Sequence, residues 1–200
     1  QYASGKIIKL DTSMASCIPG VHSIIDGKSF AEISKPLLSV LRIDIEVWPC
    51  AIEYVRYVGE PIALVLAEDR YIAEDAVENI KVSYEEYTPI INTLKATLDD
   101  APKVHNKIKS NVVSDRKFSY GNPKEAFKKA YKIVELEVEY PRNSCTPLEG
   151  FVVQSHYNAA DKNYTVRSNF QGPFSLHSVI SRSLNINENK LSSLLDEQNS

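Results

Sequence analysis

The residue types that most often carry out chemistry in proteins are few in this chain and lie far apart. None of the four histidines is spaced from another as HxH, HxxxH or HExxH, the patterns that bring two imidazoles to one metal. Each is therefore more simply explained as a surface or structural histidine. The three cysteines form no CxxC pair, which argues against a disulfide framework, a structural zinc site and a cysteine-ligated iron–sulfur cluster. These residues are His22, His105, His156 and His177, and Cys17, Cys50 and Cys145.

The short motifs of several common enzyme classes are also missing. The sequence contains no GxSxG nucleophile elbow, no GxGxxG dinucleotide motif and no GxxxxGKS or GxxxxGKT phosphate loop. One possible function is a small hydrolase that uses histidine and carboxylates from scattered positions, but no spacing in the sequence supports it. Residue types alone therefore predict an α+β protein without a visible active site.

Composition and charge exclude several classes of protein. The chain has 200 residues, of which 43% are hydrophobic and 24% charged, as in ordinary globular proteins. Its net charge of -3 provides no basic surface for nucleic acid or an anionic membrane. No apolar run reaches the roughly 18 residues of a membrane span. With three dispersed cysteines and no signal peptide, we expect a cytoplasmic protein that binds neither nucleic acid nor a membrane.

The clearest structural pattern lies in residues 55–87. A turn at Gly59-Glu60-Pro61 precedes an all-apolar segment, residues 61–67, which has the length of a buried strand. Residues 70–80 then show apolar side chains at helical spacing, and residues 81–87 are expected to form a strand. Strand, helix and strand in this order are typical of a βαβ unit, so we expect part of the first sheet to be parallel.

Shorter elements are expected on both sides of this unit. Before it we predict strands at 6–10, 21–25 and 42–48 and a short helix after the N-cap oxygens of Asp11-Thr12-Ser13. Residues 91–110 show no sustained periodicity and are expected to be a linker. After it we predict strands at 112–120 and 131–140, a helix at 124–130, a hairpin of residues 150–157 and 164–170, a helix at 173–184 and an apolar segment at 191–195.

Three segments resemble the signatures of molybdenum hydroxylase large subunits, the family of xanthine dehydrogenase, aldehyde oxidase and aerobic carbon monoxide dehydrogenase. The first is RYVGEPIALVLAEDRYIAEDA, residues 56–76. The second is NVV at 111–113 followed by GNPKEAF at 121–127. The third is RNSCTPLE at 142–149 followed by SNFQGP at 168–173. They occur in the family's order and spacing, and together they cover most of the chain.

The resemblance implies the fold class and its division into domains. The expected class is α+β, with an N-terminal α/β-hammerhead domain in residues 1–90. Residues 91–110 would be a linker, and residues 111–200 the incomplete N-terminal part of a molybdenum-cofactor-binding domain.

The resemblance also implies a cofactor-binding role for Gln171 and its neighbour Gly172. In the family, the glutamine of this turn hydrogen-bonds to a terminal ligand of molybdenum. A neutral amide can donate such a bond without adding charge. The alternative is that Gln171 only caps the following helix. Glu149 is expected to be structural, and Cys145 a buried free thiol.

The activity implied by the resemblance is molybdopterin-dependent oxidation of aldehydes, N-heterocycles or carbon monoxide. The expected partners are the rest of the large subunit and iron–sulfur and FAD subunits. However, the sequence contains neither the family's glycine-rich GGxFG loop nor its catalytic glutamate. We therefore assign no catalytic residue and no metal ligand, and expect a chain that is inactive, free of cofactor and prone to self-association when isolated. The alternative is a non-catalytic assembly module derived from the same family.

Overall fold

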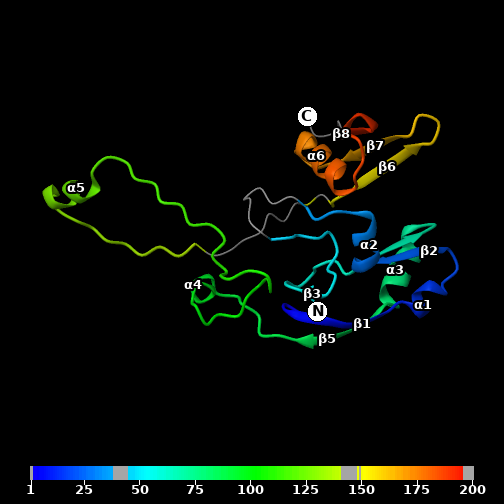
Figure 1. The fold of residues 1–200 in the computed structure, drawn as a ribbon, viewed down its shortest axis with the longest axis horizontal. Coiled ribbons are helices and arrows are strands. Elements are labelled where there is room, and N and C mark those ends of the chain that lie inside the picture. The colour runs from blue at the N-terminus through cyan, green and yellow to red at the C-terminus, as the bar shows by residue number, and fades with distance from the viewer. Residues whose placement is uncertain (1, 38–44, 141–147, 149, 196–200) are drawn as a thin grey trace.

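The computed structural model of the chain describes residues 2–37, 45–140, 148 and 150–195 (Figure 1). This part contains three small sheets and short helices. The first two sheets are built from strands in the first 86 residues, and the third from strands between residues 153 and 195. The mixture of helices with mainly antiparallel sheets is the α+β class that the sequence predicted.

The first sheet is centred on β1 (Gly5–Asp11), which pairs with β3 (Tyr54–Val55) on one side and β5 (Lys81–Glu86) on the other. Both pairings are antiparallel. The strands expected at 6–10 and 81–87 are therefore present. The strand expected at 42–48 falls partly on residues 38–44, outside the described residues, and Val47 forms one isolated bridge with Leu37.

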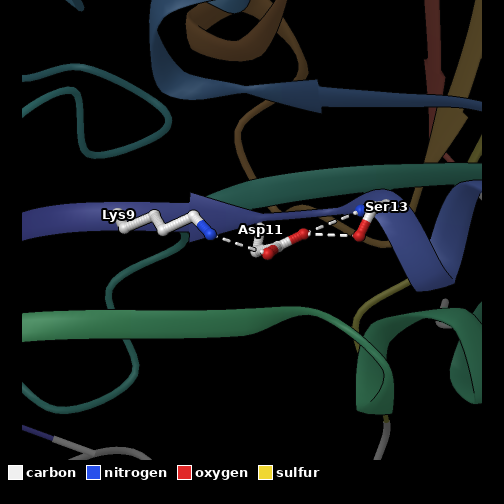
Figure 2. A network of polar contacts seen from close by, with 3 residues as sticks. All are labelled: Lys9, Asp11 and Ser13. Atoms are coloured by element: carbon white, nitrogen blue, oxygen red, sulfur yellow. Dashed lines mark hydrogen bonds and ion pairs between the residues drawn. The ribbon is translucent and has the colours of Figure 1, made fainter.

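A polar network marks the passage from β1 into the short helix α1 (Ser13–Ser16) (Figure 2). Asp11 accepts hydrogen bonds from the backbone and hydroxyl of Ser13, at 3.2 and 2.6 Å, and from Lys9 Nζ at 2.9 Å. The Ser13 hydrogen bonds and the Lys9 ammonium hold the pKa of the Asp11 carboxyl well below its usual value. Asp11 therefore accepts from the first residue of α1, whereas Thr12, the N-cap residue, makes no side-chain capping hydrogen bond.

The second sheet pairs β2 (Val21–Asp26) with β4 (Ala63–Ala67). Helix α3 (Arg70–Glu78) follows β4 and packs on this sheet, while α2 (Gly27–Ile33) follows β2. The prediction of a parallel βαβ unit is wrong, because β4 pairs antiparallel with β2 and β5 joins the first sheet. Hydrophobic periodicity indicates that a segment is a strand, but it does not identify the strand with which it pairs.

Two aspartates begin the helices of this region. Asp26 accepts a hydrogen bond from the backbone N–H of Ser29 at 2.8 Å, and Asp69 accepts one from Ile72 at 2.9 Å. The Ser29 hydrogen bond lowers the pKa of the Asp26 carboxyl. Each carboxylate satisfies an N–H that the helix itself leaves without a partner.

Replacing Asp26 with alanine is expected to lower the free energy of unfolding by about 1 kcal/mol at pH 7. Because folding lowers the pKa of Asp26, its contribution is full above the unfolded-state pKa and is lost as the pH falls through the lower folded-state pKa. The variant and the parent chain should therefore differ less at about pH 2 than at neutral pH. Urea unfolding at the two pH values measures this, with Asp99→Ala in the exposed linker as the control. An equal difference at both values would contradict the capping role.

The third sheet contains the predicted hairpin. β6 (Val153–Asn158) and β7 (Asn163–Ser168) are antiparallel, and β8 (Leu191–Leu195) pairs parallel to β7. Parallel neighbours require a crossover, which here consists of helix α6 (Pro173–Ser183) and the 3-10 turn η1 (Glu188–Lys190). The expected hairpin, the helix and the terminal apolar segment are all confirmed.

The segment between the two halves forms a long extension (Figure 1). It begins with α4 (Thr93–Ala96) in the expected linker and carries α5 (Pro123–Lys129) at its tip. The strands predicted at 112–120 and 131–140 are wrong for this structure, since neither stretch joins a sheet among the described residues. A strand needs a second strand for its backbone hydrogen bonds, and the described chain supplies none to them.

A direct contact connects the helices α2 and α6. The backbone N–H of Lys35, just after α2, donates to the carbonyl of Ser183 at 2.7 Å. The Lys35 ammonium also donates to the side-chain oxygen of Asn185 at 3.1 Å. This contact joins the first half of the chain to the layer that carries Gln171. None of the described helices is both long and apolar enough to cross a membrane.

Candidate functional site

Gln171 lies in the short turn between the end of β7 and the start of α6. Asn169 binds this turn to the residues just before β6: its side-chain oxygen accepts from Val152 N–H at 3.3 Å and its amide donates to the Gly150 carbonyl at 2.9 Å. The backbone N–H of Phe170 donates to the Ser168 hydroxyl at 3.1 Å. The backbone on the strand side of Gln171 is thus held by side chains, while the Gln171 side chain is exposed.

The helix that follows does not use Gln171 as its cap. Gly172 is the N-cap residue of α6, no side chain makes a capping hydrogen bond there, and Pro173 occupies the first turn. Gly172 lies close to a ring: a Cβ at this position would be 3.0 Å from Cε1 of Phe170. The capping alternative for Gln171 is therefore not observed, and its amide makes no hydrogen bond to another described residue.

Helix α6 is bonded to the sheet through His177 and to the crossover through Ser181. Leu176 N–H donates to the Gly172 carbonyl at 2.9 Å, which closes the first turn. His177 Nε2 lies 2.9 Å from the backbone oxygen of Leu191 in β8, and the Ser181 hydroxyl donates to the Ile186 carbonyl at 2.7 Å. These bonds join helix, crossover and strand, and so give Gln171 a rigid support.

Two exposed aromatic residues lie close to Gln171 in the chain. Phe170 directly precedes it and is 42% exposed, and Phe174, in α6, is 90% exposed. An amide offers two N–H donors and one oxygen acceptor and does not titrate. This arrangement suits one neutral hydrogen bond to an oxygen or sulfur ligand of a bound group. It cannot perform acid–base catalysis.

Apolar surface is also present where the sequence analysis expected it. Besides the two phenylalanines, Val179 and Leu184 are 37% and 39% exposed on or just after α6. Exposed apolar side chains of this number commonly mark a surface that another chain covers. The expected self-association of the isolated chain stays a prediction.

Two further sequence candidates, Cys145 and Glu149, lie outside the described residues. Among the cysteines that are described, Cys17 is exposed and Cys50 is buried, and burial raises the pKa of the Cys50 thiol. The described residues include no group of three or more histidine, cysteine or carboxylate side chains able to hold a metal ion.

A cavity that the sequence analysis did not predict lies beside the first sheet. It is a cavity of about 290 Å³ between residues 45–56 and residues 104–107. Arg56 donates to the Glu60 carboxylate at 3.1 Å, and Glu60 also accepts from the Arg56 backbone N–H. In the sequence, the spacing of Arg56 and Glu60 across the Gly59 turn was the one signal that could have indicated this cavity. The contribution of His105, from far along the chain, left no local pattern.

The electrostatics of this cavity are nearly balanced. Glu46 accepts from Lys107 Nζ at 3.0 Å, and this ion pair lowers the pKa of the Glu46 carboxyl. Burial, and to a lesser extent the Arg56 charge, lowers the pKa of His105. The Glu46–Lys107 ion pair therefore crosses the cavity, which indicates a structural junction between residues 45–56 and residues 104–107.

Models of two domain families match the chain. Residues 1–88 match the a/b hammerhead domain of aldehyde oxidase and xanthine dehydrogenase, and residues 104–194 match the molybdopterin cofactor-binding domain. The two matches fall in the order that the sequence predicted. Gln171 and Gly172 lie inside the second.

Characterised relatives match nearly the whole chain. The carbon monoxide dehydrogenase large chain of Hydrogenophaga pseudoflava is 27% identical over 94% of this chain and 25% of its own length. Aldehyde oxidase 2 of Macaca fascicularis is 31% identical over 94% of this chain and 13% of its own length. This chain therefore spans about a quarter or less of the length of these relatives.

Solved structures show the same fold. Quinoline 2-oxidoreductase from Pseudomonas putida 86 superposes with a TM-score of 0.87 at 24% identity, over 97% of this chain and 25% of that structure. A Cu,Mo carbon monoxide dehydrogenase superposes with a TM-score of 0.80 at 26% identity, over 96% of this chain and 26% of that structure.

The fold and the two family matches thus define an α/β hammerhead followed by the beginning of a molybdopterin cofactor-binding domain. The chain belongs to the molybdenum hydroxylase family, and it corresponds to the N-terminal portion of the large subunit. The resemblance identified from the three sequence segments is confirmed.

Proposed function

We propose that this chain forms one wall of the molybdopterin site in a molybdenum hydroxylase, where the Gln171 amide donates a hydrogen bond to a terminal ligand of the metal. The observation that carries the proposal is the exposed Gln171 side chain, on a turn fixed by Asn169 and not used as the cap of α6. The location of this turn within the match to the molybdopterin domain supports it.

The residues at the turn fit such a group in type and in access. Gln171 supplies a neutral donor that orients a metal ligand without changing the charge of the site. Gly172 leaves room for the Phe170 ring, because a Cβ at this position would lie 3.0 Å from Cε1 of that ring. The bound cofactor supplies the metal and the redox chemistry of the reaction. This chain positions the metal ligand and excludes water from the site. None of its residues acts as an acid or a base.

The division of the chain and its partners belong to the same proposal. We assign residues 1–90 to the hammerhead domain, 91–110 to the linker and 111–200 to the first part of the cofactor domain. The partners are the rest of the large subunit and subunits that carry iron–sulfur centres and FAD. Free Cys17 and Cys50 are compatible with a cytoplasmic location.

The names of the relatives support a small substrate that the enzyme oxidises. They include an aldehyde oxidase, a nicotine 6-hydroxylase and carbon monoxide dehydrogenases. We therefore propose that the complete enzyme oxidises an aldehyde or an N-heterocycle, or carbon monoxide.

The test is the molybdenum content of this chain alone and of the large subunit assembled from it. We expect roughly equimolar molybdenum in the assembled subunit and only background in the isolated chain, even after molybdopterin is added. The reason is that a single wall with one amide donor cannot hold the cofactor. Elemental mass spectrometry of the purified proteins makes the measurement.

The two opposite results have separate meanings. Equimolar molybdenum on the isolated chain would show that the site is complete without the rest of the subunit. An assembled subunit without molybdenum would favour the alternative, a non-catalytic assembly module.

A further inference from the structure

Residues 131–140 carry the strongest feature that the proposed function leaves unexplained. Side chains at alternate positions from 134 to 140 are apolar, and those between them are glutamates. In an extended chain this places an apolar row on one face and an acidic row on the other. The apolar row is Val134, Leu136, Val138 and Tyr140, and the acidic row is Glu135, Glu137 and Glu139.

The apolar row is uncovered. Val134, Leu136 and Val138 are 79%, 81% and 75% exposed, and Tyr140 is 82% exposed. The segment belongs to the long extension that also carries α5 (Figure 1). In an ordinary surface strand, one row of apolar side chains packs against a core. Residues 131–140 have the same alternation, but their apolar row packs against no core among the described residues.

The backbone of the segment is equally unoccupied. Among the described residues, none of the backbone hydrogen bonds outside helices and strands involves residues 131–140, and no ladder includes them. A stretch with this pattern and free N–H and C=O groups is a template for a further strand. Binding by strand addition uses the backbone for affinity and the alternating side chains for specificity.

We infer that residues 131–140 are a docking strand for a β-strand with apolar residues on one face and basic residues on the other, supplied by another part of the large subunit. That the rest of the large subunit supplies this strand rests on the proposed function, since the relatives are about four times as long as their match to this chain. Its chemistry rests on the side chains of the segment itself.

Charge selects this occupant over the two others that are available. A second copy of the same segment would place glutamates opposite glutamates, and like charges across a strand pair are destabilising. Residues 112–120 of this chain offer Arg116 and Lys117, but these are adjacent and point to opposite faces of a strand. Only one of them could meet the three glutamates. A strand with lysine or arginine at alternate positions meets all three.

The test uses the whole chain and two synthetic peptides, one in which valine alternates with lysine and one in which valine alternates with glutamate. We expect the valine–lysine peptide to slow amide hydrogen exchange in residues 131–140 by about tenfold, and the valine–glutamate peptide to leave it unchanged. The triple variant Glu135→Lys, Glu137→Lys, Glu139→Lys should reverse this preference. Because these side chains are exposed, the variant should retain the fold, which the exchange of the β1–β5 amides reports.

A matched control carries the same change of charge elsewhere: Glu78→Lys, Asp99→Lys, Asp100→Lys should keep the preference for the valine–lysine peptide. The inference is overturned if neither peptide slows exchange in the segment, or if both do so equally. It is also overturned if exchange there slows with protein concentration alone, which would identify a second copy as the occupant. None of these readouts involves molybdenum, so failure of the docking strand and failure of the cofactor site are distinguishable.

Discussion

In the complete enzyme, Gln171→Ala is expected to lower kcat/KM by about ten- to a hundredfold while the molybdenum content stays near that of the parent enzyme. The amide is proposed to orient a terminal ligand of the metal, and a methyl group cannot donate a hydrogen bond. The loss should fall on kcat more than on KM, because the interaction is with the reacting centre and not with the substrate. Steady-state kinetics and the electron paramagnetic resonance spectrum of the reduced metal measure the two effects. A purely structural role for Gln171 would not alter the spectrum.

The matched control is Gln154→Ala. Gln154 is an exposed glutamine of the same sheet, in β6, and should change neither the rate nor the spectrum. Gln171→Glu separates the hydrogen bond from the volume of the side chain, since a carboxylate has a similar size but cannot donate when ionised. We expect it to be at least as impaired as the alanine variant. Parent-like kinetics in both Gln171 variants would contradict the proposed role and favour an assembly module.

Gly27→Ala should have the largest effect on stability. A Cβ on Gly27 would lie 2.1 Å from the backbone oxygen of Ala51 and 2.7 Å from its carbonyl carbon. Both are backbone atoms in a buried part of the chain, so they cannot move aside as the end of a flexible side chain would. We expect the free energy of unfolding to fall by about 3 kcal/mol, measured by urea denaturation.

Gly150→Ala is the control for that variant. No atom of the described residues lies within 4 Å of a Cβ placed on Gly150, so the same chemical change meets open space there. It should leave the midpoint of unfolding nearly unchanged. If the two variants were equally stable, the close approach of α2 to residues 51 and 52 would be disproved.

Local elements were predictable where their hydrogen bonds and side-chain spacing are local. Helix α3 was expected from the apolar positions Ile72, Ala73 and Ala76, and the hairpin of β6 and β7 from two alternating segments joined by a polar turn. In each case one stretch of chain contains the whole signal. The aspartate caps belong to the same class, because Asp69 and its Ile72 partner are three residues apart.

The cofactor site shows the limit of such reasoning. Residue types alone favoured Gln171 as a loop glutamine that only caps a helix, and only the resemblance to a family selected it as a cofactor-binding residue. The structure adds that Asn169 binds Gly150, nineteen positions earlier, and thereby holds the turn. No local pattern announces such a bond. The cavity beside Arg56 was missed for the same reason.

The sequence by itself determined the α+β class, the family and the position of most helices and hairpins, because these depend on motifs and on contacts between near neighbours in the chain. Tertiary structure decided which strands pair: β4 lies beside β2 and β5 beside β1, in place of the parallel unit expected. It also left residues 131–140, which have the pattern of a strand, without a partner strand among the described residues. Strand pairing depends on backbone groups that every residue carries, so the choice of partner is set by which segments the whole fold brings together.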